Sequence, residues 1–207
     1  RFVGGCCGTT PDHIREIAAA VRGKVALGGG KGSAPPAGGQ ARVIHPSPGS
    51  VSSSRREPTA LGARSLLGRK LAKGEFVISQ ELLPPTGWNP SPLFDEARRA
   101  VEAGADVVSV AELSRGPRRM GTIPSAILVG REIAQEVIVR YNCRDRSMSR
   151  MISDFLGMAA AGIRNVIIAT GDPAPFGPYP DPTAVLDLDS IGLANVLARL
   201  NRGEDPG

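Results

Sequence analysis

From residue 75 onward, short apolar runs alternate with longer amphipathic stretches in a regular order. The apolar runs are rich in Val and Ile, which is typical of strands that are buried on both faces of a parallel sheet. The amphipathic stretches carry apolar residues at helical spacing and end near glycine or polar residues. This pattern predicts strands at 76–81, 106–111, 137–141 and 165–170, and helices at 91–103, 124–135, 148–161 and 190–201.

The spacing of these strands indicates the fold class. They begin at intervals of 30, 31 and 28 residues. A repeated strand–helix unit of this length is typical of a (β/α)8 TIM barrel, in which all strands are parallel. A doubly wound open sheet is the alternative, because four units fill only half of a barrel. We therefore expect an α/β fold of the TIM-barrel type, with about four βα units.

A separate strand–helix signal lies near the amino-terminal end. Residues 2–3 are expected to end a strand, and a tight glycine-flanked turn that contains Cys6 and Cys7 follows. Thr10 is a suitable N-cap for a helix that starts at Pro11, where proline is favoured. The unit is therefore predicted to be a short strand, a turn and one helix.

A stretch poor in apolar residues follows. Residues 28–54 contain 7 Gly, 4 Pro and 6 Ser, which together fill 17 of 27 positions. Such a composition buries too little apolar surface to offset the entropy of ordering the chain, so we expect a disordered linker from Gly28 to about Arg56. Residues 59–74 predict a short amphipathic helix. The expected organisation is an amino-terminal unit at 1–24, a basic linker at 25–74 and the α/β domain at 75–207.

The net charge of +5 is an average over two unlike parts: residues 1–74 carry a net charge of +9, and residues 75–207 carry −4. A basic segment can attract nucleic acid through its summed field. Here, however, no aromatic residue lies between Phe2 and Phe76 to stack on bases. We therefore predict a solvated linker and no nucleic-acid partner.

Other features of the chain indicate its setting. No stretch approaches the roughly 18 consecutive apolar residues that a membrane-spanning helix needs, and no basic start precedes an apolar leader. The chain begins with Arg1 rather than Met, so we expect it to be a segment of a longer protein. The three cysteines are an odd number and two are adjacent, which favours a reducing, cytoplasmic setting.

Polar and ionisable residues follow each predicted strand at its carboxyl end, where parallel α/β folds bind their ligands. Glu81 and Glu112 follow the first two strands, and the third strand runs into residues 140–142. The fourth strand runs into residues 170–172. Four strand ends of this kind are typical of an active site, and Glu81 suits proton donation.

Several of these residues have a purely structural alternative. Glu81 can be a solvated strand-end carboxylate, and Asp172, which precedes a proline, can shape a turn. Cys143 has no histidine near it in the sequence, so we expect a small buried residue rather than a nucleophile. Residues 144–145 can pair with each other. Cys6 and Cys7 can both reach a Zn²⁺ ion, but two ligands do not complete a tetrahedral site.

The amino-terminal string Gly4-Gly5-Cys6-Cys7-Gly8-Thr9-Thr10-Pro11-Asp12-His13-Ile14 resembles the closing motif of the zinc-dependent homocysteine S-methyltransferase barrel. The resemblance implies that Cys6 and Cys7 are zinc ligands and that homocysteine is the substrate of that domain. In that family a third cysteine comes from an earlier strand, and this chain does not contain it.

Residues 75–207 resemble the amino-terminal half of the methylenetetrahydrofolate reductase barrel, which belongs to a flavoprotein family. The matching motifs are Glu81 with Pro84-Pro85, and Thr170-Gly171-Asp172-Pro173 after the fourth strand. Residues 179–180, 183–185 and 189–193 resemble a subgroup that is fused to a homocysteine methyltransferase. The order of that fusion is the order of the segments here.

The resemblance implies that FAD binds at the strand ends and that hydride passes from NAD(P)H through the flavin to methylenetetrahydrofolate. Glu81 would protonate the folate nitrogen, and Asp172 would lie beside flavin and pterin and tune the ring. Arg140 stands where many members have His, and Ala111-Glu112 replace a Thr-Tyr pair. The implied FAD contacts are Ala111, Glu112, Arg140, Tyr141, Asn142, Ala169, Thr170, Gly171 and Asp172.

We therefore expect a segment of a bifunctional homocysteine S-methyltransferase and methylenetetrahydrofolate reductase. One alternative is that its activity is zinc-dependent methyl transfer. The other is an inactive half-barrel that binds nothing or associates only with a complementary half. Its two exposed sheet edges also favour a homo-oligomer.

Overall fold

The structure is a computed structural model, and it describes residues 2–5, 10–21, 57–113, 118–133, 136–171 and 185–204. Most of the expected linker lies outside these residues. Cys6, Cys7 and Asp172 also lie outside them.

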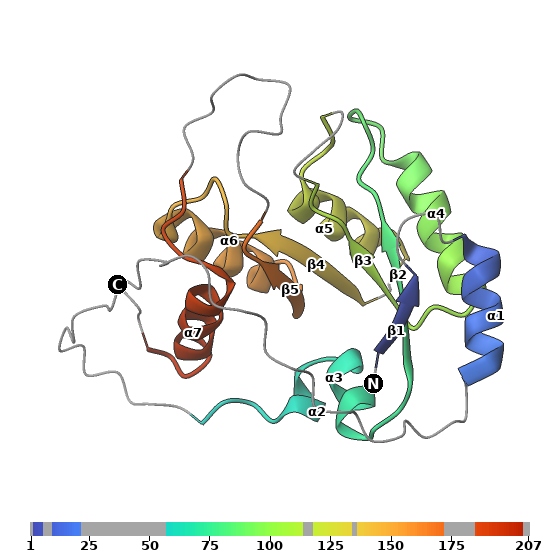
Figure 1. Ribbon diagram of the computed structural model, residues 1–207, viewed down its shortest axis with the longest axis horizontal. Coiled ribbons are helices and arrows are strands. Elements are labelled where there is room, and N and C mark those ends of the chain that lie inside the picture. Colours follow the sequence, from blue (N-terminus) through green and yellow to red (C-terminus); the bar gives the residue numbers. More distant parts are fainter. Residues whose placement is uncertain are drawn as a thin grey trace, which may run out of the picture.

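The described strands form one parallel sheet in the order β1-β2-β3-β4-β5 (Figure 1). Each strand therefore lies beside its neighbour in the sequence. A doubly wound sheet reverses its strand order at one point, and this sheet does not, so the arrangement is that of consecutive barrel units. The strands are β1 (Phe2–Gly5), β2 (Val77–Leu82), β3 (Val107–Val110), β4 (Val137–Asn142) and β5 (Asn165–Ala169).

Amphipathic helices cover one face of this sheet, which we call the outer face (Figure 1). The four helices after β2 begin and end within two residues of the predicted positions, and the Asp189 carboxylate caps the last one by accepting from Gly192 N–H at 2.7 Å. None of the helices in the described part of the chain is long and apolar enough to cross a membrane. The helices are α1 (Pro11–Val21), α4 (Ser91–Glu102), α5 (Thr122–Ile133), α6 (Met148–Ala160) and α7 (Ser190–Leu200).

The two faces of the sheet differ because side chains alternate along each strand. On the outer face, Ile78, Val108 and Val139 lie in the main hydrophobic core with the helices. On the opposite face, which we call the inner face, Val77 and Ile138 belong to a second, smaller core. Because every second side chain of a strand shares a face, Glu81 of β2, Ser109 of β3 and Arg140 of β4 lie on the inner face toward its carboxyl edge.

Two short helices, α2 (Leu61–Arg64) and α3 (Leu66–Ala72), close the amino-terminal end of the inner face. The single helix expected over 59–74 is wrong, because Ser65 adopts an extended conformation between them. Its hydroxyl caps α3 by accepting from Gly68 N–H at 2.8 Å and donates to Asn165 at 3.0 Å. The Glu136 carboxylate accepts from the first backbone N–H groups of α3. Ser65 therefore separates the two helices, because its extended backbone ends α2 and its side chain caps the start of α3.

The strand of the amino-terminal unit, β1, is the fifth strand of the same sheet. β1 pairs in parallel with β2, with Phe2 opposite Val77 and Gly5 opposite Gln80. Ile14 of α1 is fully buried in the main core, which also contains residues of α4. The sequence predicted this strand and helix but not their place beside β2.

Candidate functional site

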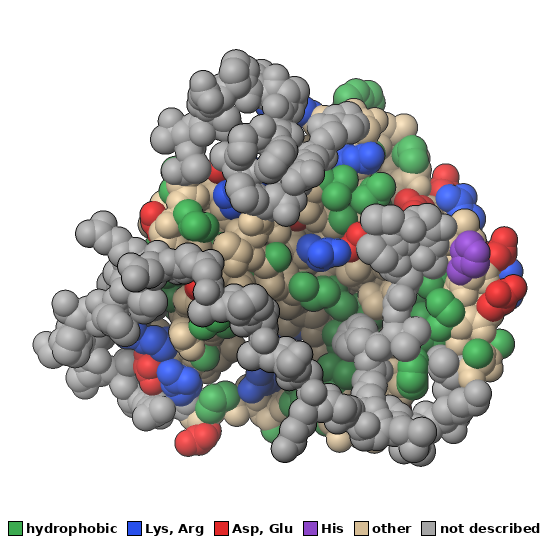
Figure 2. All heavy atoms as spheres, viewed as in Figure 1, with side chains coloured by type: hydrophobic (Ala, Val, Ile, Leu, Met, Phe, Trp, Pro, Cys, Tyr) green, Lys and Arg blue, Asp and Glu red, His purple; other side chains and the backbone are tan. Residues whose placement is uncertain are grey.

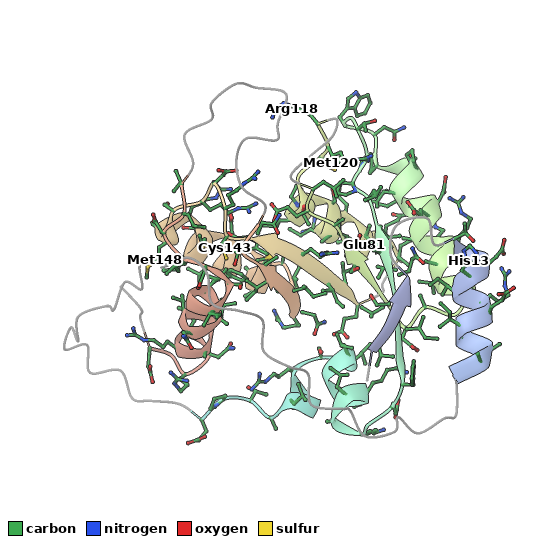
Figure 3. The ribbon with its side chains drawn as sticks, viewed as in Figure 1. His13, Glu81, Arg118, Met120, Cys143 and Met148 are labelled. Atoms are coloured by element: carbon green, nitrogen blue, oxygen red, sulfur yellow. The ribbon has the colours of Figure 1, made fainter. Side chains whose placement is uncertain are left out.

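Several of the predicted site residues lie at the carboxyl edge of the inner face. In the space-filling view toward this face, basic and acidic side chains lie against each other near its centre, above a group of hydrophobic ones (Figure 2). Figure 3 labels Glu81 beside β2 and β3, and Cys143 on the side of β4 and α6. Four of the predicted residues share this face by alternation: Glu81, Arg140, Asn142 and Ala169.

Glu81 forms an ion pair with Arg140, whose Nη1 donates to Glu81 Oε2. The pair reaches across β3, where the residue opposite Glu81 is the small Ser109. The Glu81 side chain is 20% exposed and the Arg140 side chain 41%. A guanidinium therefore lies against the carboxylate that the sequence analysis assigned to proton donation.

Glu112 and Asn142 join the ends of β3 and β4. The Glu112 carboxylate accepts from Asn142 N–H at 2.5 Å and from the guanidinium of Arg146. Arg146 also donates to the Asn142 carbonyl at 2.6 Å. Ala111, immediately before Glu112, is buried, and its carbonyl accepts from the Thr122 hydroxyl at 3.0 Å. These contacts leave the Glu112 carboxylate already engaged by the protein.

Tyr141 points away from the inner face. Its hydroxyl donates to Asp154 of α6 at 2.9 Å, and its ring centroid lies 4.8 Å from that of Phe155. Burial, reinforced by the Asp154 hydrogen bond, raises the pKa of the Tyr141 phenol above its usual range. Only the Tyr141 backbone is thus left for a ligand at the inner face, a consequence of strand alternation that the sequence could have indicated.

The end of β5 is tied to the β4–α6 loop and to α7. The carbonyls of Ala169 and Thr170 accept from backbone N–H groups of that loop at 2.9 and 3.1 Å. The Thr170 hydroxyl lies 3.1 Å from the Ser190 hydroxyl and accepts from Ser190 N–H at 3.2 Å. Gly171 has a φ of 96°, and a Cβ there would lie only 2.9 Å from Arg144 Cβ. The close approach of the segments around Gly171 and Arg144 therefore requires glycine at this position.

Cys143 is fully buried, as expected for a small core residue. Burial raises the pKa of its thiol to about 11, so the nucleophilic thiolate is disfavoured. Arg144 and Asp145 pair with each other at 2.8 Å, which confirms the predicted contact. Neither observation assigns a chemical role to these residues.

Two residues of this region escaped sequence analysis. Arg146 lies in a polar run, where no local pattern marks it. Asp154 lies at helical spacing from Met151 and Met158 on the buried side of α6, and an acidic residue on an apolar stripe was a signal that could have found it. Among the described residues, no group of three or more His, Cys, Asp and Glu side chains could hold a metal ion.

Comparisons with known proteins agree with this geometry. The family model for methylenetetrahydrofolate reductase matches residues 66–183, which include β2 to β5. The model for homocysteine S-methyltransferase matches residues 1–21, which include β1 and α1.

Individual relatives cover less. Methionine synthase from Mycobacterium leprae (strain TN) is 95% identical over 20 residues, which are 10% of this chain and 2% of that protein, so the chain spans a small part of its length. Dihydrodipicolinate synthase from Oceanobacillus iheyensis aligns with 51% of this chain and 33% of its own, at 14% identity and a TM-score of 0.31, too slight a likeness to add support.

The first family match extends over more than half of the chain, and the sheet order is that of consecutive barrel units. The α/β fold is therefore part of a (β/α)8 barrel, and the chain belongs to the methylenetetrahydrofolate reductase family.

Proposed function

We propose that this chain is the amino-terminal part of a flavin-dependent methylenetetrahydrofolate reductase, which uses NAD(P)H to form 5-methyltetrahydrofolate. Family membership supports reductase chemistry on this folate. The observation that supports this detailed proposal is the position of Glu81. It is an acidic residue on the inner face at the carboxyl edge, where barrels hold their ligands. Since the chain spans so little of its curated relative, the activity is proposed for the longer protein.

The described residues fit a flat, partly polar ring at this edge. Ala111 and Ala169 are small, and Arg140 and Asn142 carry hydrogen-bond donors. We assign FAD to this edge, where it would supply hydride transfer when bound. The residues proposed to hold it are Ala111, Glu112, Arg140, Tyr141 through its backbone, Asn142, Ala169, Thr170, Gly171 and Asp172.

Glu81 is proposed to donate a proton to the folate nitrogen, so that the methylene bridge opens to the reducible iminium. Its Arg140 partner holds the carboxylate in place over β3 before substrate binds. The ion pair must open, and the carboxyl group must take up a proton, before Glu81 can act as an acid. Asp172 is proposed to lie beside flavin and pterin.

The test is Glu81→Gln in the intact protein, with Glu102→Gln on the exposed side of α4 as the matched control. We expect Glu81→Gln to leave flavin reduction by NAD(P)H unchanged and to lower folate reduction by at least about 100-fold, the lower range of acid–base contributions. Stopped-flow absorbance of the flavin separates the two half-reactions. Normal folate turnover in this variant would refute the assignment.

A second candidate function is zinc-dependent methyl transfer to homocysteine, favoured by the family match over residues 1–21. Cys6 and Cys7 would supply two of the four ligands of a tetrahedral zinc site, and the third cysteine of the family lies on an earlier strand that this chain does not contain. We therefore assign no step of methyl transfer to these residues. Zinc content and methyl transfer in Cys6→Ser and wild-type intact protein test this candidate.

The remaining candidate is a half-barrel without activity. β1 and β5 are the two edges of the described sheet, and exposed edges favour self-association of the isolated chain. A flavin spectrum that survives desalting would support the reductase proposal. Colourless aggregates on size-exclusion chromatography would favour the inactive half-barrel.

A further inference from the structure

Arg146 is bound on every side of its guanidinium. Nη1 donates to the Asn142 carbonyl at 2.6 Å, and Nη2 pairs with the Glu112 carboxylate. Nε lies 3.6 Å from Asp154 Oδ2, and the guanidinium carbon lies 4.4 Å from the centroid of the Tyr141 ring. The side chain is only 24% exposed. Because each of these contacts engages a different part of the planar guanidinium, the Arg146 side chain is held in one orientation.

The backbone of Asn142 is consequently held at both its N–H and its C=O group. Its N–H donates to one oxygen of Glu112 at 2.5 Å, and its C=O accepts from Arg146, which binds the other oxygen of the same carboxylate. We call this closed ring of contacts among Glu112, Asn142 and Arg146 the edge clamp. It joins the end of β3 to the end of β4 at the edge where the site residues meet.

The clamp also reaches the segment before α7. Arg146 forms a backbone bridge with Leu186, and Asp145 N–H donates to the Val185 carbonyl at 2.8 Å. Arg146 therefore lies where β3, β4, α6 and the start of α7 meet. Movement of its side chain would be felt at the ends of both neighbouring strands.

Arg150 offers an internal comparison. Like Arg146, it pairs with Asp154, at 2.8 Å, but its side chain is 70% exposed and, among the described residues, its guanidinium makes no contact with the clamp. Removing Arg146 would leave Asp154 with a cation, whereas the described contacts show no second cation on Glu112. The two arginines thus separate the effect of the clamp from the effect of one charge on α6.

We propose that Arg146 is a positioning residue for the FAD site: it neutralises Glu112 and fixes the backbone N–H and C=O groups of Asn142 at the inner-face edge of β4. Glu112 then acts through the clamp, because both of its oxygens are engaged by the protein. The inference rests on the proposed function only in naming FAD as the ligand. The geometry of the clamp is testable without cofactor.

The first experiment measures amide hydrogen exchange in the full chain without flavin, for wild type, Arg146→Met, Arg146→Lys and Arg150→Met. We expect exchange at Asn142 N–H to accelerate at least 10-fold in both Arg146 variants and to stay within twofold in Arg150→Met. Lysine keeps the charge but loses the planar fork, so it does not rescue the geometry. If Arg146→Met does not fold, Arg146→Lys and Glu112→Gln decide. Unchanged exchange in the folded Arg146 variants would overturn the proposal.

The second experiment measures the Kd of FAD by quenching of flavin fluorescence on the same proteins. Both Arg146 variants are expected to bind at least 10-fold more weakly, and Arg150→Met within twofold of wild type. The double variant Glu112→Gln/Arg146→Met should bind no more weakly than Arg146→Met, because both residues act through one clamp. Wild-type affinity in Arg146→Lys would show that charge alone suffices and would overturn the inference. If the wild-type chain binds no FAD, the flavin site on this chain fails, and hydrogen exchange still decides the clamp.

Discussion

Ile14→Ala tests whether the amino-terminal unit belongs to the same cooperative fold as the reductase segment. Ile14 is fully buried, and its cluster includes Leu93, Ala97 and Ala100 of α4. The two segments match different family models, so nothing in their sequences requires them to pack together. A large effect of this one substitution on the whole chain would show that they do.

The magnitude follows from the atoms removed. Ile→Ala deletes three carbon atoms, and at about 0.8 kcal/mol for each buried methylene equivalent the transfer contribution is about 2.4 kcal/mol. The cavity that remains adds to this, so the expected loss in free energy of unfolding is about 2–5 kcal/mol. Since a domain of this size has a total stability of roughly 5–15 kcal/mol, the shift is large.

Urea unfolding of the 207-residue chain, followed by far-ultraviolet circular dichroism, measures this loss. The control is Glu16→Ala on the exposed side of α1, which we expect to change stability by less than about 0.5 kcal/mol. A single transition with a lower midpoint and an unchanged slope is the expected result for Ile14→Ala. A loss below about 0.5 kcal/mol, or a separate transition for the amino-terminal unit, would refute the five-stranded sheet as one cooperative unit.

Two further predictions concern the carboxyl edge. Gly171→Ala should destabilise the chain by about 1–3 kcal/mol, because its φ is positive and the new Cβ would meet Arg144; urea unfolding checks this, and an unchanged midpoint would contradict the close approach. Burial raises the pKa of the Cys143 thiol to about 11, so the folded state keeps this proton where the unfolded chain loses it. The contribution of this proton to the free energy of unfolding has its full value below about pH 8. It falls as pH rises from about 9 to 11, by on the order of 2–3 kcal/mol in total. Unfolding at pH 8, 9 and 10 measures this slope, which Cys143→Ala should reduce; equal slopes in the two proteins would count against the buried thiol.

Much of the local structure could be predicted from the sequence. The strands β2 to β5 and the helices that follow them begin and end within two residues of their predicted positions. Burial on the two faces of a strand or on one side of a helix leaves a periodic trace in the residues themselves. The N-cap Asp189 and the motifs around Glu81 could also be predicted, because recognising them requires only residues that are neighbours in the sequence.

Only the tertiary structure decided how distant residues meet. Strand order and register bring Arg140 to Glu81, 59 residues away, and Arg146 to Glu112, 34 residues away. They also place β1 beside β2. The packing of α6 against the sheet brings Asp154 to the Tyr141 hydroxyl. Hydrophobic periodicity reports whether a position is buried, but it carries no record of the partner that buries it, because that partner is chosen by the packing of the whole chain.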